Sequence, residues 1–285
     1  MMNDFFRHNM ASWIRYDDYV WKTAPDGQEY LIPAEGAKPN RYKVFDEAET
    51  LVIDALHAAM TAIVYREDEA EVHRAIRGFV CKYGLLGIMT ALPATTKFMD
   101  YEKVFLPKNI LIRDEVLDTE QYLDMFFPFG RPEMSDPTEF EELKKLIFMY
   151  FAAPDSVPMA TCRQYGERYD WLKKIFQDWM FVFFSVMVYS DKKSEMDADM
   201  IQDIQDGLSA FDGNAPTYHF RLYGGPVIVW DFHSLLLVLQ MAISMMLTDP
   251  KNQVKFCKGC GRPFVAKNRN MKYCSKECRN YDDKL

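Results

Sequence analysis

The sequence contains few of the residues that interrupt regular structure. Only 13 of its 285 residues are glycine and 14 are proline, a combined share below the roughly 12% of average proteins. This shortage excludes collagen-like and low-complexity chains and favours long, uninterrupted elements. Hydrophobic residues make up 49% of the chain and aromatic residues 15%, which is enough to bury a sizeable core and excludes general disorder. The length corresponds to about two ordinary domains.

Long apolar runs are also missing. The most apolar stretches are Trp179–Tyr189, which is too short to cross a bilayer, and Pro226–Leu247, which polar residues interrupt. Met1–Trp13 mixes acidic and basic side chains and has no apolar segment typical of a signal peptide. We therefore expect a soluble cytoplasmic protein with no membrane partner, in which paired cysteines bind a metal.

Common catalytic and nucleotide-binding motifs are absent too. We find no Gly-x-Gly-x-x-Gly, P-loop, His-Glu-x-x-His or Gly-x-Ser-x-Gly, assign no catalytic or cofactor-binding residue, and expect a non-enzymatic protein. A weaker alternative starts from Arg66 and His73, which resemble the Arg…His pair of helical HEPN-type ribonucleases. The acidic residues between them would repel RNA. Ribonuclease activity that His73→Ala abolishes would favour this alternative.

The net charge of −8 conceals an uneven distribution. Residues 251–285 carry ten Lys and Arg against three acidic residues, a net charge of +7. The first 250 residues carry 24 basic and 39 acidic side chains, a net charge of −15. The chain is therefore predicted to consist of an acidic body, residues 1–250, and a basic module, residues 251–285. The acidic total does not exclude a nucleic-acid partner.

Hydrophobic periodicity predicts a mostly helical body. Apolar residues recur at helical spacing, and the predicted helices cover residues 46–65, 69–92, 118–125, 136–151, 163–189, 196–211 and 233–247. Turn residues predict one hairpin around Ala24–Gly27 and another around Gly224-Gly225, with an isolated strand at 110–112. The predicted fold class is mainly α (α+β), a helical body with small β-hairpins and a C-terminal finger that resembles a treble clef.

Four of the six cysteines lie close together in the basic module: Cys257, Cys260, Cys274 and Cys278. The two-residue gap between Cys257 and Cys260 lets both thiolates reach one ion, and the small Gly259 and Gly261 let the backbone curl around it. The three-residue gap before Cys278 places the last two sulfurs one helical turn apart. Between the pairs, residues 263–265 and 271–273 are predicted to form a hairpin with Phe264 and Tyr273 as a small core. Four thiolates leave no open coordination position, so we expect one structural Zn²⁺ rather than a catalytic one. Two disulfides, or four metal-free thiols, are the alternatives.

These residues resemble a known family. The segment Cys257-Lys258-Gly259-Cys260-Gly261, followed by Lys272-Tyr273-Cys274 and Cys278-Arg279, is similar to the C-terminal four-cysteine fingers of bacterial and phage proteins. It resembles in particular the CGNR-type zinc fingers of transcriptional regulators, which also follow a hairpin and an apolar helix. The resemblance covers residues 215–281, and Arg279-Asn280 stands where that family has Gly-Asn-Arg. It implies DNA binding and a role in transcription regulation.

Basic residues around the cysteines are the candidate nucleic-acid contacts: Lys267, Arg269, Lys272, Lys276 and Arg279. Neutralisation of the zinc–thiolate centre is an alternative role for these charges, although its charge of −2 leaves a basic excess. Docking of the module on the acidic body is another. The leading hypothesis is a zinc-dependent, DNA-binding regulator whose body senses a small molecule or a protein. The main alternative is an interaction protein whose zinc finger is purely structural.

Overall fold

The computed structural model describes residues 8–90, 103–106, 115–130, 163–209, 216–232, 234–248, 253–268 and 270–282. The strands are β1 (Asn9–Met10), β2 (Ser12–Tyr16), β3 (Tyr19–Thr23), β4 (Glu29–Pro33), β5 (Pro39–Lys43), β6 (Lys103–Leu106), β7 (Glu115–Asp118), β8 (Glu167–Arg168), β9 (Thr217–Leu222), β10 (Pro226–Asp231), β11 (Gln253–Phe256) and β12 (Pro263–Ala266). The α-helices are α2 (Ala48–Val64), α3 (Glu69–Tyr83), α5 (Thr119–Phe126), α7 (Tyr169–Lys192), α8 (Ala198–Ser209), α9 (Leu235–Thr248) and α10 (Lys276–Asp282). Short 3-10 helices cover Val44–Glu47, Ile88–Thr90 and Lys193–Glu195.

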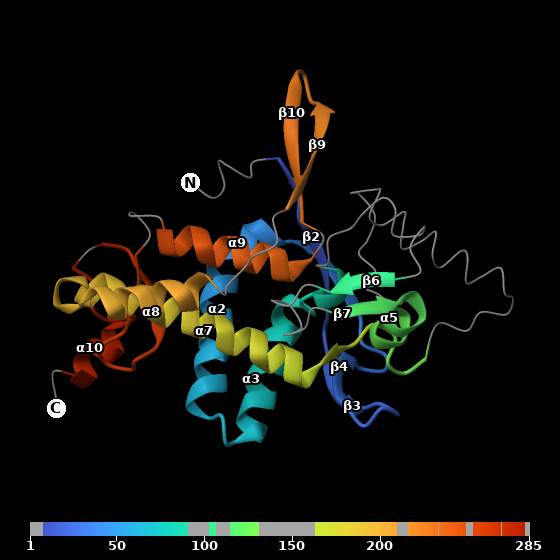
Figure 1. Ribbon diagram of the computed structural model, residues 1–285, viewed down its shortest axis with the longest axis horizontal. Helices are drawn as coiled ribbons and strands as arrows, with labels where there is room; N and C mark the ends of the chain where they lie inside the picture. The colour runs from blue at the N-terminus through green and yellow to red at the C-terminus, as the bar shows by residue number, and fades with distance from the viewer. Residues whose placement is uncertain are drawn as a thin grey trace, which may run out of the picture. The chain divides into compact units, whose positions relative to one another are not determined.

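About half of the described residues are helical, and the strands pair into small, mostly antiparallel sheets (Figure 1). This confirms the predicted α+β composition with small hairpins. Among the described helices, none combines the length and apolar character that a membrane crossing needs. The predicted strand at 110–112 and the predicted helix at 136–151 lie outside the described residues.

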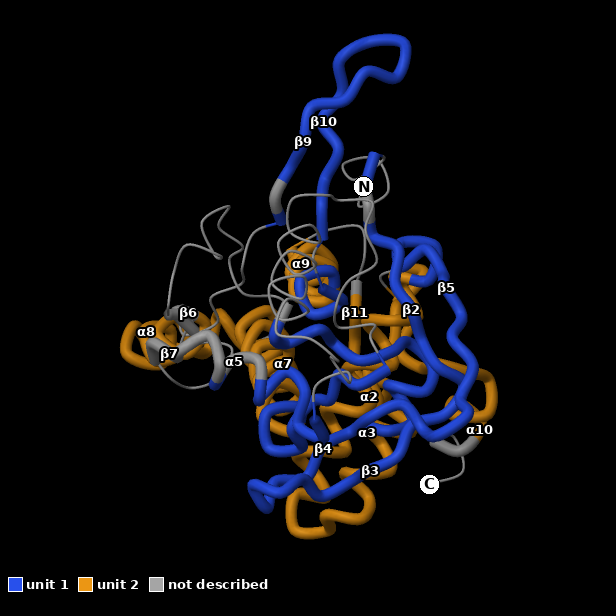
Figure 2. The backbone as a smooth tube through the Cα atoms, turned by 90° about the vertical axis from the view of Figure 1, so that its right-hand side faces the viewer, with its two compact units in different colours: residues 1–47, 76–172, 213–238 blue, residues 48–75, 173–212, 239–285 orange. Residues whose placement is uncertain are grey.

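The chain divides into two compact units, which Figure 2 colours separately. Unit 1 comprises residues 1–47, 76–172 and 213–238, and unit 2 comprises residues 48–75, 173–212 and 239–285. Three of the five boundaries between the units fall inside α3, α7 and α9. All four cysteines of the predicted finger belong to unit 2, together with α2 and α8. The division into an acidic body and a basic module rests on charge and stays a prediction.

The first predicted hairpin is confirmed in unit 1. β3 pairs antiparallel with β4, and β4 also pairs with β8. In the turn, Gly27 has a φ of 79°, and the Asp26 carboxylate accepts a hydrogen bond from the N–H of Gln28 at 2.8 Å. A glycine with positive φ and an aspartate that caps its own turn are what a tight connection of this kind requires.

The second predicted helix ends nine residues earlier than the expected boundary at 92, because α3 stops at Tyr83. Gly84 takes a φ of +95° and donates its N–H to the Val80 carbonyl at 2.7 Å, which is a helix cap in the left-handed conformation. A β-carbon at Gly84 would lie 2.6 Å from the Ile14 carbonyl oxygen. Leu85 is buried outside any helix. The apolar spacing beyond residue 84 therefore reflects core burial, and the α-helix does not continue there.

A buried glutamate holds the segment that follows α3. Glu167 is 1% exposed, and its carboxylate accepts hydrogen bonds from the backbone N–H groups of Leu86, Gly87 and Ile88 at 2.8, 2.6 and 2.9 Å. The Tyr165 hydroxyl donates to the same carboxylate at 2.8 Å. Burial raises the pKa of Glu167, and these four hydrogen bonds lower it in part.

The predicted helix at 163–189 begins six residues late, at Tyr169. Glu167 and Arg168 instead form β8, opposite Leu31 and Tyr30 of β4. Tertiary contacts decide this boundary, because the Glu167 side chain is fixed in the core of unit 1.

In unit 2, α2 and α7 form the predicted helical core. α2 buries Leu51 and Leu56 along with several alanines, whose small side chains allow close approach of a neighbouring helix. The Gln177 side-chain amide on α7 donates to the Ala62 carbonyl on α2 at 3.1 Å. Phe176 and Phe183 on α7 are completely buried. The prediction that this long apolar helix runs through a core is confirmed for the part of α7 in unit 2.

The second predicted hairpin is confirmed as β9 and β10, which pair antiparallel around Gly224-Gly225. Gly224 has a φ of 72°, and β10 also pairs with β1, in parallel. The helices predicted at 118–125, 196–211 and 233–247 are α5, α8 and α9, with boundaries shifted by one or two residues.

Candidate metal centre

The four-cysteine module begins as a hairpin that carries a knuckle at its turn. β11 pairs antiparallel with β12, and residues 257–262 connect them, with the N–H of Gly261 bonded to the Cys257 carbonyl at 2.8 Å. The predicted hairpin of 263–265 with 271–273 is wrong. Lys272 instead lies against the knuckle, where its carbonyl accepts the N–H of Lys258 at 2.9 Å. The strand that pairs with residues 263–266 is the upstream segment 253–256.

Two glycines let the knuckle close. A β-carbon at Gly259 would lie 2.5 Å from the backbone carbonyl oxygen of Cys278, so a larger residue would push the first and last cysteines apart. Gly261 has a φ of 70°, a conformation that side chains with a β-carbon rarely adopt. Gly259 and Gly261, which flank Cys260, thus allow the close backbone approach and the turn that the knuckle requires.

The sulfurs of the four cysteines lie together. All four Sγ atoms are within 4.8 Å of one another, with Cys260 and Cys274 3.7 Å apart and Cys274 and Cys278 3.5 Å apart. A tetrahedral zinc–thiolate centre with Zn–S bonds of about 2.3 Å has sulfurs about 3.8 Å apart. The separations therefore fit one tetrahedral metal ion, and no further protein ligand is needed to complete its coordination.

The electrostatics of the sulfurs agree with this fit. Burial raises the pKa of the Cys257 thiol, but backbone N–H groups of Cys274, Cys260 and Gly259 outweigh it and lower the pKa to about 6. Burial, together with the sulfurs of Cys278 and Cys257, raises the pKa of Cys274 to about 12. Four thiolates at these separations repel one another, and a divalent cation among them removes that repulsion.

The last cysteine pair is placed differently from the prediction. Cys278 lies in α10, but Cys274 precedes the helix, which begins at Lys276. The hydroxyl of Ser275 accepts the N–H of Cys278 at 3.2 Å, the hydrogen bond of a helix N-cap. Cys274 donates its own N–H to the Cys257 sulfur at 3.3 Å. The two sulfurs still converge, because the turn before α10 replaces the expected helical turn.

The predicted small core of the module is confirmed. Phe264 is 6% exposed and packs with Cys257 and Ala266, and Tyr273 and Met271 cover this cluster from the other segment. Few apolar residues take part, so a bound metal would contribute much of the module's stability.

Contacts within unit 2 anchor the module to helices. The Nε2 atom of His57 on α2 donates to the carbonyl of Pro263 in β12 at 2.8 Å. Phe256 in β11 makes an edge contact with Phe183 on α7, with ring centroids 5.1 Å apart. No feature of the sequence indicates the His57 contact, since a histidine on an amphipathic helix has no preferred partner. The alternation of Val254 and Phe256 does indicate a strand with one buried face.

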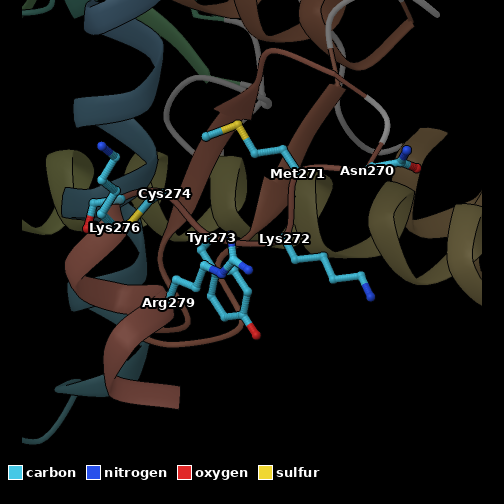
Figure 3. Close-up of a pocket in the computed structure, with 8 residues that line it drawn as sticks. Asn270, Met271, Lys272, Tyr273, Cys274, Lys276 and Arg279 are labelled. Carbon is cyan, nitrogen blue, oxygen red and sulfur yellow. The ribbon is translucent and has the colours of Figure 1, made fainter. Parts of the chain in front are cut away.

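Four of the five predicted nucleic-acid contacts are exposed: Lys267, Lys272, Lys276 and Arg279. Arg269 lies outside the described residues. An open depression of about 680 Å³ is lined by Asn270, Met271, Lys272, Tyr273, Cys274, Ser275, Lys276 and Arg279, and we call it the basic depression. In Figure 3 the Arg279 side chain runs from α10 toward Tyr273. The lining residues include three cations and no acidic residue.

Known proteins give no guide to this site. No protein-family model, curated protein or solved structure matches the chain. The resemblance to CGNR-type fingers therefore rests on the sequence pattern, and the site must be interpreted from its own geometry.

The residues of the ribonuclease alternative have local partners. Arg66 pairs with Glu67 at 3.3 Å, where both side chains are exposed. The His73 Nδ1 atom lies 2.6 Å from the carbonyl of Glu69, one turn earlier in α3. These contacts are typical of a helix and the turn before it, and the ribonuclease alternative stays untested.

Proposed function

We propose that the four cysteines bind one structural Zn²⁺ and that the module they stabilise binds nucleic acid. Thiolates are soft ligands, and a closed tetrahedral set of four favours zinc over magnesium or calcium. With all four positions taken by protein, the metal has no site for a substrate or water, so its role is structural. When bound, the ion would connect three segments of the module: the knuckle, the residues before α10, and α10 itself.

The basic depression carries the nucleic-acid part of this proposal. Lys272, Lys276 and Arg279 line one concave surface, and none of the residues that line it is acidic. Phosphate oxygens bind to clustered lysine and arginine side chains, with release of counterions. The zinc–thiolate centre carries a charge of −2, which reduces the net charge of +7 in residues 251–285 without removing it.

The arrangement of the module supports a treble-clef-like finger. A knuckle at a hairpin turn supplies Cys257 and Cys260, and a short helix supplies Cys278. Together with the resemblance to CGNR-type fingers, this order leads us to infer a transcriptional regulator of bacterial or phage origin that acts in the cytoplasm. The acidic residues 1–250 would then sense a small molecule or a protein partner.

Salt-dependent binding tests the nucleic-acid proposal. Fluorescence anisotropy would measure affinity for labelled duplex DNA at several salt concentrations, for the wild type and for the triple variant Lys272→Ala, Lys276→Ala, Arg279→Ala. Because each lost phosphate contact lowers the slope of log affinity against log salt by roughly 0.9, the slope should fall by about 2 to 3. Absence of binding at low salt would reject the proposal.

A matched control uses exposed cations elsewhere. Lys38, Arg41 and Lys43 lie in or beside β5 in unit 1 and are exposed. Their replacement by alanine changes the net charge by the same amount as the test variant. If both triple variants weaken DNA binding equally, attraction is a property of total charge and the assignment to the basic depression is wrong.

A purely structural finger is the second candidate, and the contacts of His57 and Phe256 favour it. They attach the module to α2 and α7 within unit 2, as expected of a motif that completes a fold. Metal analysis and thermal unfolding of the wild type and Cys260→Ser distinguish the candidates. Loss of about one zinc per chain and of thermal stability, with no DNA binding by the wild type, would establish the structural role alone.

A further inference from the structure

The C-terminal hairpin of unit 1 exposes a row of large apolar side chains. Phe220 is 72% exposed, Leu222 is 82% exposed and Tyr218 is 55% exposed. Side chains two residues apart on a strand lie on the same face, so these three form one row along β9. The exposure of so many neighbouring apolar groups is unusual, since isolated exposed residues are the norm.

β10 extends the row across the hairpin. The register pairs Leu222 with Pro226, Phe220 with Ile228, and Tyr218 with Trp230. Ile228 is 44% exposed, and the rings of Tyr218 and Trp230 are in edge contact, with centroids 5.9 Å apart. These six residues form one uninterrupted face, which we call the apolar ladder: Tyr218, Phe220, Leu222, Pro226, Ile228 and Trp230.

Charge is confined to the opposite face of the hairpin. His219, Arg221 and Asp231 alternate with the ladder residues along the strands, so the ladder itself contains no ionisable acid or base other than the Tyr218 phenol. His219 Nε2 lies 3.4 Å from the Asp231 carboxylate. Figures 1 and 2 show that the turn end of the β9–β10 hairpin lies away from the other labelled strands of unit 1.

We propose that the apolar ladder is a homodimer interface, on which a second copy of this chain packs its own ladder about a twofold axis. An aromatic side chain contributes about 150–250 Å², so the exposed parts of the ladder amount to roughly 500–600 Å². Two copies would together bury roughly 1,000–1,200 Å², at the lower limit of specific interfaces. An area of this size is typical of a weak, reversible dimer.

The charge pattern favours a second copy over a lipid surface. Two chains of net charge −8 repel one another, and an uncharged face is where that repulsion costs least on contact. Peripheral membrane binding combines apolar groups with several lysines or arginines. Between residues 217 and 231 the hairpin has one such residue, Arg221, and the acidic chain would be repelled by anionic headgroups.

Sedimentation velocity of the full chain over a micromolar concentration range tests the dimer. The wild type should shift from monomer to dimer, and the variant Phe220→Ser, Leu222→Ser should weaken dimerisation by at least about 100-fold, because both copies lose buried apolar area. The matched control is Arg221→Ser, Val227→Ser, which alters the opposite face and should leave the dimer unchanged. Far-UV circular dichroism would show that all chains remain folded.

A photo-crosslinking phenylalanine analogue at position 220 identifies the contact directly. Crosslinks between copies at ladder residues would support the proposal even if the serine variants fail to fold. A wild type that stays monomeric, a dimer unaffected by the ladder substitutions, or crosslinks to other segments of the same chain would overturn it. So would binding of the monomer to phosphatidylcholine vesicles that Phe220→Ser, Leu222→Ser abolishes.

Discussion

Replacement of Glu167 by glutamine should destabilise unit 1 strongly. In the wild type one carboxylate oxygen accepts the N–H groups of Gly87 and Ile88 and the Tyr165 hydroxyl, and the other accepts the N–H of Leu86. A glutamine amide has one oxygen and one NH₂ group, so one backbone N–H would face a donor inside the core. The substitution preserves the size of the side chain and tests hydrogen bonding specifically.

The expected loss is about 2–4 kcal/mol of unfolding free energy. A buried donor without an acceptor costs about 1–3 kcal/mol, and hydrogen bonds to a neutral amide are weaker than those to a charged group. Urea unfolding followed by tryptophan fluorescence, at a pH above the raised pKa of Glu167 so that the carboxylate is ionised, measures the difference through the midpoint and slope. Glu35→Gln is the control, because Glu35 is exposed and such substitutions change stability by less than about 0.5 kcal/mol.

The pH dependence gives an independent check. Burial raises the pKa of Glu167, so folding favours the protonated carboxyl. Stability from this group is complete below the pKa of the unfolded state and decreases as pH rises through the raised pKa of the folded state. The glutamine variant should lack this decrease. A loss no greater than that of Glu35→Gln, together with an unchanged pH profile, would show that this carboxylate does not stabilise residues 86–88.

Three further predictions concern the metal, one anchor and one glycine. Removal of metal by a chelator should unfold the four-cysteine module, because structural zinc contributes an apparent ~10–16 kcal/mol. Amide hydrogen exchange in the module should then rise sharply. Unchanged protection from exchange would contradict a role of the metal in stability. His57→Ala should cost about 1 kcal/mol of unfolding free energy through the lost bond to the Pro263 carbonyl, measured by urea unfolding. Gly84→Ala should lower the unfolding free energy by about 1 kcal/mol or more beyond the loss from Gly36→Ala, as measured by thermal unfolding. Both glycines have positive φ, but a β-carbon at Gly84 would lie 2.6 Å from the Ile14 carbonyl oxygen, whereas one at Gly36 would meet open space. Equal losses would show that the backbone moves to relieve the contact.

Local signals were sufficient for the two hairpins of unit 1 and for most helix cores. Asp26 and Gly27 form the turn that their side-chain chemistry predicts, and Gly224-Gly225 does the same for β9 and β10. Helix ends were less predictable. The apolar spacing continues past Gly84, whereas α3 ends at Tyr83. At Glu167 the predicted helix gave way to a strand, since a buried carboxylate with three backbone donors outweighs local propensity.

The metal centre was the most predictable part of the site. Cysteine spacing alone predicts that four sulfurs can reach one ion, and the Sγ positions agree. The pairing of β12 with β11 rather than with residues 271–273 was not predictable, because Gln253–Phe256 has no cysteine to mark it as part of the module. The basic depression likewise depends on how residues 270–279 fold around α10.

The ligand set, the uneven charge and the positions of the tight turns follow from the amino-acid sequence, because they depend on residue type and short spacing. The tertiary structure decided which strands pair, where α3 and α7 begin or end, and how His57 and Phe256 hold the module to α2 and α7. It also decided that one face of the β9–β10 hairpin is exposed. Burial, backbone hydrogen bonding and exposure depend on segments far apart in the chain, and local residue patterns do not specify how such segments come together.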